Sequence, residues 1–347
     1  MTKIRVMIVE DSAVIRALLK HIIKRDPRLE VAATAESGEQ ALQILERLSP
    51  DVIAMDIRLP GMDGLEATRR IMSRKPIPIV VVAGSVASQA RDATTMEALR
   101  AGALTVLEKP AGTTHADYET LAERLCTQLA IMSQVKLVRQ HAARRHGSGW
   151  ACVARHRGAY SMLGIVCSTG GPAALVPLLR VLGPDFPLPI LMVQHITASF
   201  LPGFASWLAG VCPFSVVVVK GGEIPALHTV YLAPPDRHLL LKSGRLYLDS
   251  GELECGQRPS GTVLFQSMAR RLGGSALGVL LTGMGEDGAT GLLEIREAGG
   301  YTIAEDQSTA VVYGMPAAAV RLGAVCESLP LHAIAPKVLD LVAAWRD

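Results

Sequence analysis

Short apolar runs alternate with segments of helical periodicity along this chain, and they do so in two blocks. This alternation restricts the possible folds more than any other feature of the sequence. In the first block the runs are Ile4–Val9, Glu30–Ala35, Val52–Met55, Ile77–Val82 and Leu104–Leu107. In the second block they are Met162–Cys167, Pro189–Val193, Ser215–Val219, Thr229–Leu232 and Ala276–Leu281. Runs that are apolar throughout suit parallel strands covered by helices on both faces. We therefore predict an α/β protein with two doubly wound parallel sheets.

The region between Lys136 and Arg157 separates the blocks, because it carries many basic residues and no acidic one. We assign residues 1–122 to a flavodoxin-like (βα)5 domain, 123–158 to a helix end and basic linker, and 159–347 to a Rossmann-like domain. A length of 347 residues agrees with two separate cores. Turn signals within Tyr231–Leu248 predict an antiparallel hairpin appended to the second sheet.

Composition excludes several classes of protein. The formal net charge of +3 is too small to indicate nucleic-acid binding, which needs clustered basic residues on one surface. The six cysteines lack the spacing of disulfide frameworks or metal sites, so we expect reduced thiols. No apolar run reaches the roughly 18 residues of a membrane span. These features predict a cytoplasmic protein without membrane insertion.

Three carboxylates are expected at one edge of the first sheet, because Glu10 and Asp11 follow its first strand and Asp56 its third. Carboxylates at close range repel one another unless a cation neutralises them, and their oxygens suit Mg²⁺. Lys109 follows the fifth strand and can reach the same crevice. Singly, these residues could be helix caps or surface charges. As an ordered set they predict a phosphoryl-accepting site with Asp56 as the nucleophile.

A serine lies at a predicted strand-to-helix turn of the second domain. Ser168 and Thr169 follow an apolar run and precede Gly170, Gly171 and a helical pattern. Such a turn exposes the serine oxygen at the sheet edge, and the helix N-terminus offers N–H groups to a developing oxyanion. The motif departs from G-x-S-x-G, and by itself it favours a helix cap over a nucleophile.

Two further turns supply a base and a carboxylate at the same edge. His195 follows the next strand, and Asp287 lies in the turn after Ala276–Leu281. A carboxylate there can orient the imidazole and stabilise its charged form. The competing residues are His238 as the base, and Glu286 or Asp306 as the carboxylate.

The first domain resembles a response-regulator receiver over roughly 120 residues, through VEDS at Val9–Ser12, MDIRLPGMDG at Met55–Gly64 and EKP at Glu108–Pro110. The resemblance implies that Mg²⁺ is held by Glu10, Asp11, Asp56 and the backbone carbonyl of Arg58. It also implies that Asp56 is phosphorylated by a partner histidine kinase. Ala83 stands where receivers carry Ser or Thr, and Val106 where they carry an aromatic residue; Ser85 lies near enough to replace the missing hydroxyl.

The second domain resembles the catalytic domain of CheB-family chemotaxis methylesterases. The matching segments are STGGP at Ser168–Pro172, QH at Gln194–His195, VYLAPPDRH at Val230–His238, RPS at Arg258–Ser260, LTGMGEDG at Leu281–Gly288 and YGMP at Tyr313–Pro316. The resemblance implies a catalytic triad of Ser168, His195 and Asp287, with oxyanion donors around Thr169 and Met284. The esterase step would need no cofactor.

The expected function is demethylation of glutamate γ-methyl esters on the cytoplasmic helices of chemoreceptors, with deamidation of selected glutamines. The resemblance also implies that the receiver blocks the hydrolase until Asp56 is phosphorylated. The alternative is a phosphorylation-dependent receptor-binding module without hydrolytic activity. A nucleotide-binding protein would rest only on Gly170 and Gly171, and no recognition-helix module indicates a DNA-binding regulator.

Overall fold

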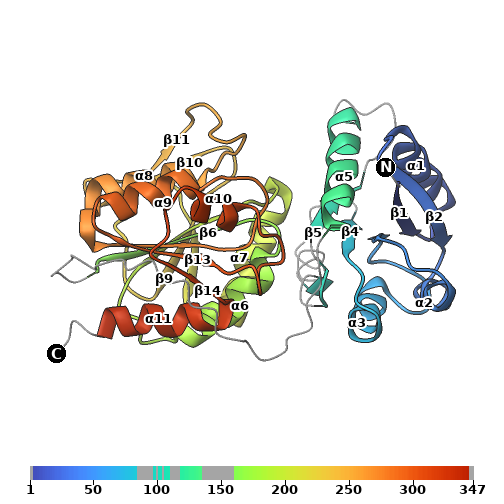
Figure 1. Cartoon of the computed structure of the whole chain (residues 1–347), viewed down its shortest axis with the longest axis horizontal. Coiled ribbons are helices and arrows are strands. Elements are labelled where there is room, and N and C mark those ends of the chain that lie inside the picture. The colour runs from blue at the N-terminus through green and yellow to red at the C-terminus, as the bar shows by residue number, and fades with distance from the viewer. Residues whose placement is uncertain are drawn as a thin grey trace. The chain divides into compact units, whose positions relative to one another are not determined.

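The computed structural model in Figure 1 describes residues 3–83, 97–98, 101–103, 105–109, 118–134 and 160–343. The chain divides into two compact units, Met1–Leu137 and Val138–Asp347. Nearly all of the expected basic linker lies outside the described residues. Among the described helices, none combines the length and apolarity that crossing a bilayer requires.

The first unit is a five-stranded parallel sheet with the order β2-β1-β3-β4-β5. Its strands are β1 (Ile4–Val9), β2 (Leu29–Ala35), β3 (Val52–Met55), β4 (Ile79–Ala83) and β5 (Thr105–Glu108). Its described helices are α1 (Ala13–Arg25), α2 (Gly38–Arg47), α3 (Gly64–Arg74) and α5 (Tyr118–Met132). The predicted flavodoxin-like topology is confirmed. The strand order reverses between β1 and β3, so a crevice opens beyond their carboxyl ends.

The second unit is built on a seven-stranded parallel sheet with the order β14-β13-β12-β6-β7-β9-β8. The strands are β6 (Met162–Cys167), β7 (Ile190–Gln194), β8 (Ser215–Val218), β9 (Thr229–Leu232), β12 (Ala276–Leu280), β13 (Tyr301–Glu305) and β14 (Glu327–Leu329). The main helices are α6 (Gly171–Leu182), α7 (Leu201–Val211), α8 (Gly261–Leu272), α9 (Ala289–Glu297), α10 (Met315–Arg321) and α11 (Leu331–Ala343), with short 3-10 turns at Ala198–Phe200 and Gly273–Ser275. Figure 1 shows α8 and α9 on one face of this sheet and α6 and α11 on the other. The doubly wound parallel fold is as predicted.

The predicted antiparallel hairpin is present, but it is not joined to the parallel sheet. It consists of β10 (His238–Lys242) and β11 (Arg245–Asp249), which pair only with each other and form a separate two-stranded sheet. Tyr231 and Leu232, at the start of the region with hairpin turn signals, belong to β9 of the parallel sheet, as the apolar run Thr229–Leu232 predicts. The hairpin packs on α8, where Leu239, Leu241 and Leu246 are buried. Helix α8 therefore covers the apolar face of the hairpin, and the hairpin does not extend the main sheet.

The direction of winding of the second sheet changes between β6 and β12, which pair side by side. Ligands of doubly wound sheets bind beyond the carboxyl ends of strands at such a reversal. Helix α8 lies unusually close to β6, because a Cβ on Gly164 would fall 2.7 Å from the sulfur of Met268, and one on Gly261 would fall 2.3 Å from Val166. These glycines bring the N-terminus of α8 to the same edge of the sheet.

Candidate active site and phosphoryl site

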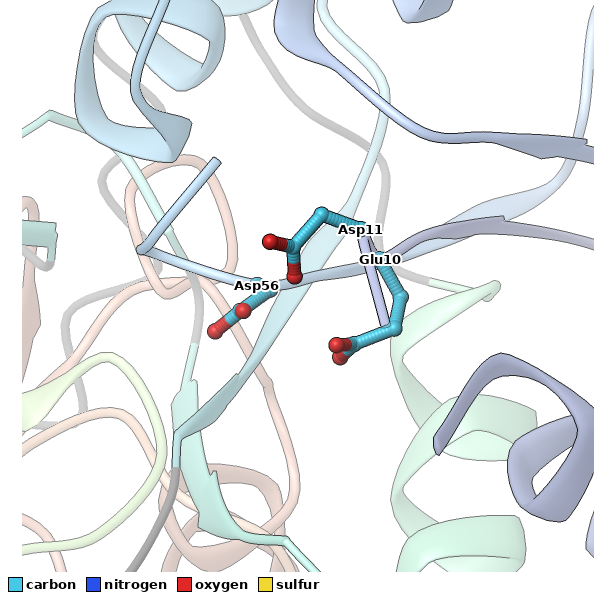
Figure 2. A group of neighbouring side chains, drawn as sticks. All are labelled: Glu10, Asp11 and Asp56. Carbon is cyan, nitrogen blue, oxygen red and sulfur yellow. The ribbon is translucent and has the colours of Figure 1, made fainter. Parts of the chain in front are cut away.

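The carboxylates of the first unit converge as expected. Single carboxylate oxygens of Glu10, Asp11 and Asp56 lie within 4.8 Å of one another, and Figure 2 shows the three groups at one edge of the sheet. The Nζ atom of Lys109 lies 2.8 Å from Oε2 of Glu10 and 2.8 Å from Oδ2 of Asp56. Burial raises the pKa of Glu10, and the hydrogen bond from Lys109 offsets this only in part. A further cation would therefore be stabilised here, and hard oxygen ligands of this kind fit Mg²⁺.

The two positions that depart from the receiver pattern lie on neighbouring strands of the sheet. Ala83 is the last residue of β4, and its carbonyl accepts the N–H of Lys109 at 2.8 Å. Val106 is a half-buried residue of β5. Ser85, the expected substitute for a hydroxyl at position 83, lies outside the described residues. The charged groups expected of a phosphoryl site thus lie together, whereas position 83 offers no hydroxyl.

Ser168 occupies the turn between β6 and α6, and neighbouring backbone holds that turn in place. Its N–H donates to the carbonyl of Thr282 at 3.0 Å, while its carbonyl accepts the N–H of Gly171 at 2.9 Å and Nε2 of Gln194 at 2.9 Å. Gly170 has φ of +82°, a left-handed conformation that favours glycine. The turn thus presents residue 168 at the sheet edge, directly before the N-terminus of α6.

His195 and Asp287 are joined by a hydrogen bond between Nε2 and Oδ2 of 2.9 Å. His195 follows β7, and Asp287 lies in the loop between β12 and α9, so residues distant in sequence meet where parallel strands end. The side chain of Asp287 is 2% exposed. Burial alone would raise the pKa of Asp287, but hydrogen bonds from His195, Ser260 and Gly261 hold it below its ordinary value. The group is therefore a carboxylate at neutral pH.

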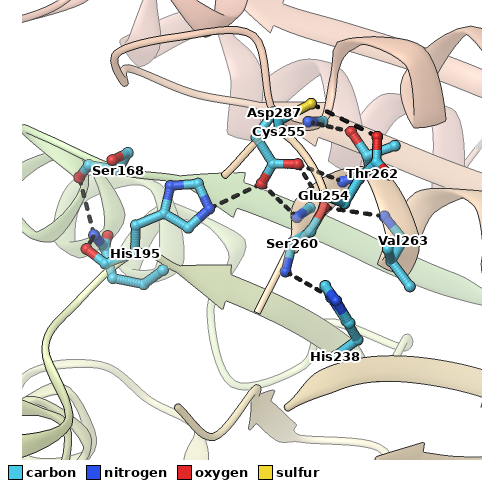
Figure 3. Close-up of polar contacts among 12 residues, drawn as sticks. Ser168, His195, His238, Glu254, Cys255, Ser260, Thr262, Val263 and Asp287 are labelled. Atoms are coloured by element: carbon cyan, nitrogen blue, oxygen red, sulfur yellow. Dashed lines mark hydrogen bonds and ion pairs between the residues drawn. The ribbon is translucent and has the colours of Figure 1, made fainter. Parts of the chain in front are cut away.

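Ser168 and His195 are neighbours through the pairing of β6 with β7. The last paired residues are Cys167 and Gln194, and the N–H of His195 donates to the carbonyl of Cys167 at 3.1 Å. Figure 3 shows the imidazole of His195 between the labelled Ser168 and Asp287. No hydrogen bond joins Ser168 Oγ to the imidazole among the described residues. Since Nε2 bonds Asp287, Nδ1 is the ring nitrogen left for the serine, the reverse of the chymotrypsin arrangement.

The N-terminus of α8 forms a cradle for Asp287 that sequence reasoning missed (Figure 3). Ser260 Oγ donates to Oδ1 at 2.6 Å, the N–H of Gly261 to Oδ2 at 2.6 Å, and the N–H of Thr262 to Oδ1 at 3.0 Å. Free N–H groups at a helix N-terminus stabilise negative charge. The only sequence signal was Ser260 in the RPS segment, which matched the family without indicating a role.

The competing candidates make other contacts. His238 is buried, its Nδ1 accepts the N–H of Ser260 at 3.2 Å, and its Nε2 contacts the carbonyl of Glu252 at 2.8 Å. Glu286 is exposed. Asp306 accepts the N–H of Ser308 within its own turn. None of the three forms a hydrogen bond or ion pair with His195 among the described residues, and His238 instead supports the cradle through Ser260.

The oxyanion candidates lie on two neighbouring loops: Thr169 follows Ser168 in the turn after β6, and Met284 lies in the loop after β12. The N–H groups of Thr169 and Met284 donate to no acceptor among the described residues, so both remain available to a ligand. The loops approach closely, since a Cβ on Gly283 would fall 2.8 Å from Cβ of Ser168. Met284 itself is 44% exposed. The arrangement suits a nucleophilic attack whose developing charge meets backbone donors.

Comparison with known proteins identifies the family. Residues 163–338 match the family model described as CheB methylesterase, which covers just over half of the chain, and residues 6–117 match that of the response regulator receiver domain. The chain belongs to the CheB methylesterase family. A protein-glutamate methylesterase/protein-glutamine glutaminase of Paramagnetospirillum magneticum is 57% identical, covering 98% of this chain and 97% of that protein. One of Nitrosospira multiformis is 43% identical over the same shares of the two chains.

A solved structure supports the fold of this CheB-family chain. The methylesterase catalytic domain of CheB from Thermotoga maritima aligns with a TM-score of 0.51 and 34% identity. The alignment covers 53% of this chain and 100% of that domain. The likeness agrees with the second unit being a CheB-type catalytic domain.

Proposed function

We propose that this CheB-family protein is a phosphorylation-regulated serine hydrolase that demethylates glutamate γ-methyl esters of chemoreceptors and deamidates specific glutamines. The names of its relatives support both activities. The observation that carries the proposal is the hydrogen bond of 2.9 Å between His195 and Asp287, beside a strand-to-helix turn that bears Ser168. Nothing in the contacts of this site favours binding without hydrolysis.

In the proposed reaction, Ser168 Oγ attacks the ester carbonyl and transfers its proton to Nδ1 of His195. Asp287 holds the ring through Nε2 and stabilises the imidazolium. The imidazolium then protonates the departing methoxide, which leaves as methanol, or the departing amide nitrogen of a glutamine, which leaves as ammonia. A water molecule, deprotonated by His195, cleaves the acyl-enzyme and releases the free glutamate and the serine.

The proposed oxyanion donors are the N–H groups of Thr169 and Met284. Each such donor is worth about 3 kcal/mol in transition-state stabilisation. Their lack of an acceptor among the described residues supports this role, because a donor already bonded within the protein would have to break that bond. No cofactor is required by these steps.

For the receiver, we propose that Asp56 accepts a phosphoryl group from a partner histidine kinase and that Lys109 contacts that group. Glu10, Asp11, Asp56 and the carbonyl of Arg58 would hold Mg²⁺, which supplies positive charge against the phosphoryl oxygens. Phosphorylation would relieve a block of the hydrolase by the receiver, a change that requires an interface of different stability in the two states.

The proposed setting is the cytoplasm, with receptor helices as the substrate and without nucleic acid or membrane insertion. The five cysteines among the described residues are free, in keeping with a reducing compartment. The net charge of +3 is too low to support nucleic-acid binding.

The decisive experiment measures methanol release from a methylated receptor fragment, with and without a small phosphodonor. We expect release by the wild-type chain, an increase with the phosphodonor, and no release by Ser168→Ala. Retained binding of the fragment by Ser168→Ala would show that the substitution removes only the chemistry. Equal methanol release by both proteins would refute the assignment of the nucleophile.

A further inference from the structure

A buried carboxyl group that takes no part in the triad lies at the same sheet edge. Glu305 ends β13 and is 1% exposed. Among the described residues it forms no ion pair with a cation. Buried carboxyl groups without a cation are costly, so this one needs a compensating role or strong hydrogen bonds.

The carboxyl group of Glu305 bonds the residue that holds the nucleophile turn. Its Oε2 accepts the N–H of Thr282 at 2.9 Å. The carbonyl of Thr282 in turn accepts the N–H of Ser168 at 3.0 Å, and its hydroxyl donates to the carbonyl of Thr169 at 2.9 Å. Thr282 is fully buried, so water cannot replace these bonds. A continuous chain of hydrogen bonds thus runs from Glu305 to the two residues at the proposed reaction centre.

We infer that Glu305 is a positioning residue for the hydrolase, which sets the position of Ser168 and of the Thr169 N–H through Thr282. The inference rests on the proposed esterase function. The placement of Thr282 explains why the effect reaches catalysis. Its loop continues into Gly283, where an added Cβ would lie 2.8 Å from Cβ of Ser168, and into Met284, the second proposed oxyanion donor. Loss of the bond to Glu305 frees one end of this loop.

The electrostatic surroundings agree with a group that acts by accepting a hydrogen bond. Burial raises the pKa of Glu305 to about 7, against the hydrogen bonds from Thr282 and Thr309, and Asp306 adds to the rise. The pKa of Cys167 is also raised, mainly by burial and to a lesser extent by the nearby Glu305. Asp306 and Cys167 are thus the titratable groups that act on Glu305, and neither is a cation. An uncharged acceptor of the same shape should therefore replace the carboxyl group.

The first test compares Glu305→Gln with Glu305→Leu in the full chain, with methanol release as the readout. The glutamine keeps a carbonyl oxygen for the Thr282 N–H, and we expect kcat within about twofold of wild type, since the acceptor remains. The leucine removes the acceptor, and we expect kcat to fall at least about tenfold with little change in KM, because small displacements of reacting groups are costly. A folded Glu305→Leu chain with wild-type kcat overturns the inference.

The second test covers the case in which Glu305→Leu does not fold. Thr282→Val removes the hydroxyl that donates to the Thr169 carbonyl and accepts the N–H of Val312. Thr302→Val is the matched control, because the Thr302 hydroxyl also donates to a carbonyl, that of Ala324, and accepts an N–H, that of Cys326. We expect only the first substitution to lower kcat, and Thr282→Ser to restore it. Equal losses at positions 282 and 302 would mean that the effect is general destabilisation, and the inference would be wrong.

Hydrogen exchange separates this inference from the proposed function. If wild type releases no methanol, the esterase proposal fails, and exchange of the Ser168 and Thr282 amides still decides the role of Glu305. Faster exchange of both amides in Glu305→Leu than in Glu305→Gln supports the chain of bonds. Unchanged exchange in the leucine variant, or equal acceleration in both variants, overturns it.

Discussion

Ser260 Oγ lies 2.6 Å from Oδ1 of Asp287, and this bond couples a helix cap to the proposed catalytic carboxylate. The same oxygen of Ser260 accepts the N–H of Val263 at 3.3 Å, as the N-cap of α8. One hydroxyl therefore both begins the helix and helps to keep Asp287 ionised. His238 accepts the N–H of Ser260 and so fixes the cap from the other side.

Ser260→Ala is expected to impair both catalysis and stability. A hydrogen bond to a charged group is worth about 1.5–3 kcal/mol, so kcat/KM should fall about 10- to 100-fold, and loss of this bond together with the cap should cost about 2–4 kcal/mol of unfolding free energy. Steady-state methanol release and thermal unfolding measure the two effects. Ser37→Ala is the control, because Ser37 caps α2 through the Gln40 N–H at 3.2 Å and touches no catalytic group. Similar activity losses in both variants would contradict the coupling.

Gly283→Ala is expected to disrupt the nucleophile turn. The added Cβ would lie 2.2 Å from the sulfur of Met315 and 2.8 Å from Cβ of Ser168, so the loop or the serine must move. A displacement of about 1 Å can cost on the order of 100-fold in kcat. Gly210→Ala, where a new Cβ meets nothing within 4 Å, should leave methanol release unchanged. A fully active Gly283→Ala enzyme would show that this close approach is not required.

The stability of the chain should depend on the ionisation of Glu305. Its pKa of about 7 in the folded chain exceeds the ordinary value of 4.5, so the folded state binds the proton more tightly. The resulting stabilisation is fully present below pH 4.5 and is lost as the pH rises through about 7, by about 3 kcal/mol in total. Relative to wild type, Glu305→Gln should therefore gain thermal stability between pH 5 and pH 8. A constant difference in Tm across this range would contradict the shift.

Mg²⁺ binding should depend on the carboxylates after β1. Asp11→Ala removes one of three converging oxygen ligands, and we expect the affinity for Mg²⁺, measured by titration calorimetry on the full chain, to fall about tenfold or more. The effect of a small phosphodonor on methanol release should weaken in parallel. Asp26→Ala provides the control, since Asp26 caps the opposite end of α1 and pairs with Arg28. Unaltered Mg²⁺ affinity in Asp11→Ala would exclude this residue as a ligand.

Strand positions were predictable because buried parallel strands need continuous apolar runs. Ile4–Val9 and Val52–Met55 end where the sequence indicates, while β4 begins two residues later than predicted. The antiparallel hairpin was also predicted, but its alternating apolar residues show only that one face is buried and do not indicate that α8, and not a strand of the main sheet, packs against it. Similarly, the sequence placed His195 and Asp287 at one sheet edge, but a pattern cannot show which ring nitrogen meets the carboxylate.

The sequence alone determined the two α/β units, the edge of each sheet that carries polar groups, and the residues proposed for the triad and the phosphoryl site. The units and the polar edges follow from local periodicity and from the residues that come after each strand. The choice of His195 over His238, and of Asp287 over Glu286 and Asp306, came from the resemblance to the CheB family. Only the tertiary structure revealed the cradle of Ser260, Gly261 and Thr262 around Asp287 and the contact of Glu305 with Thr282. Apart from the bond donated by the Ser260 hydroxyl, those contacts join backbone N–H groups to side chains from distant segments. Every residue except proline has such an N–H, so the sequence does not indicate which of them take part.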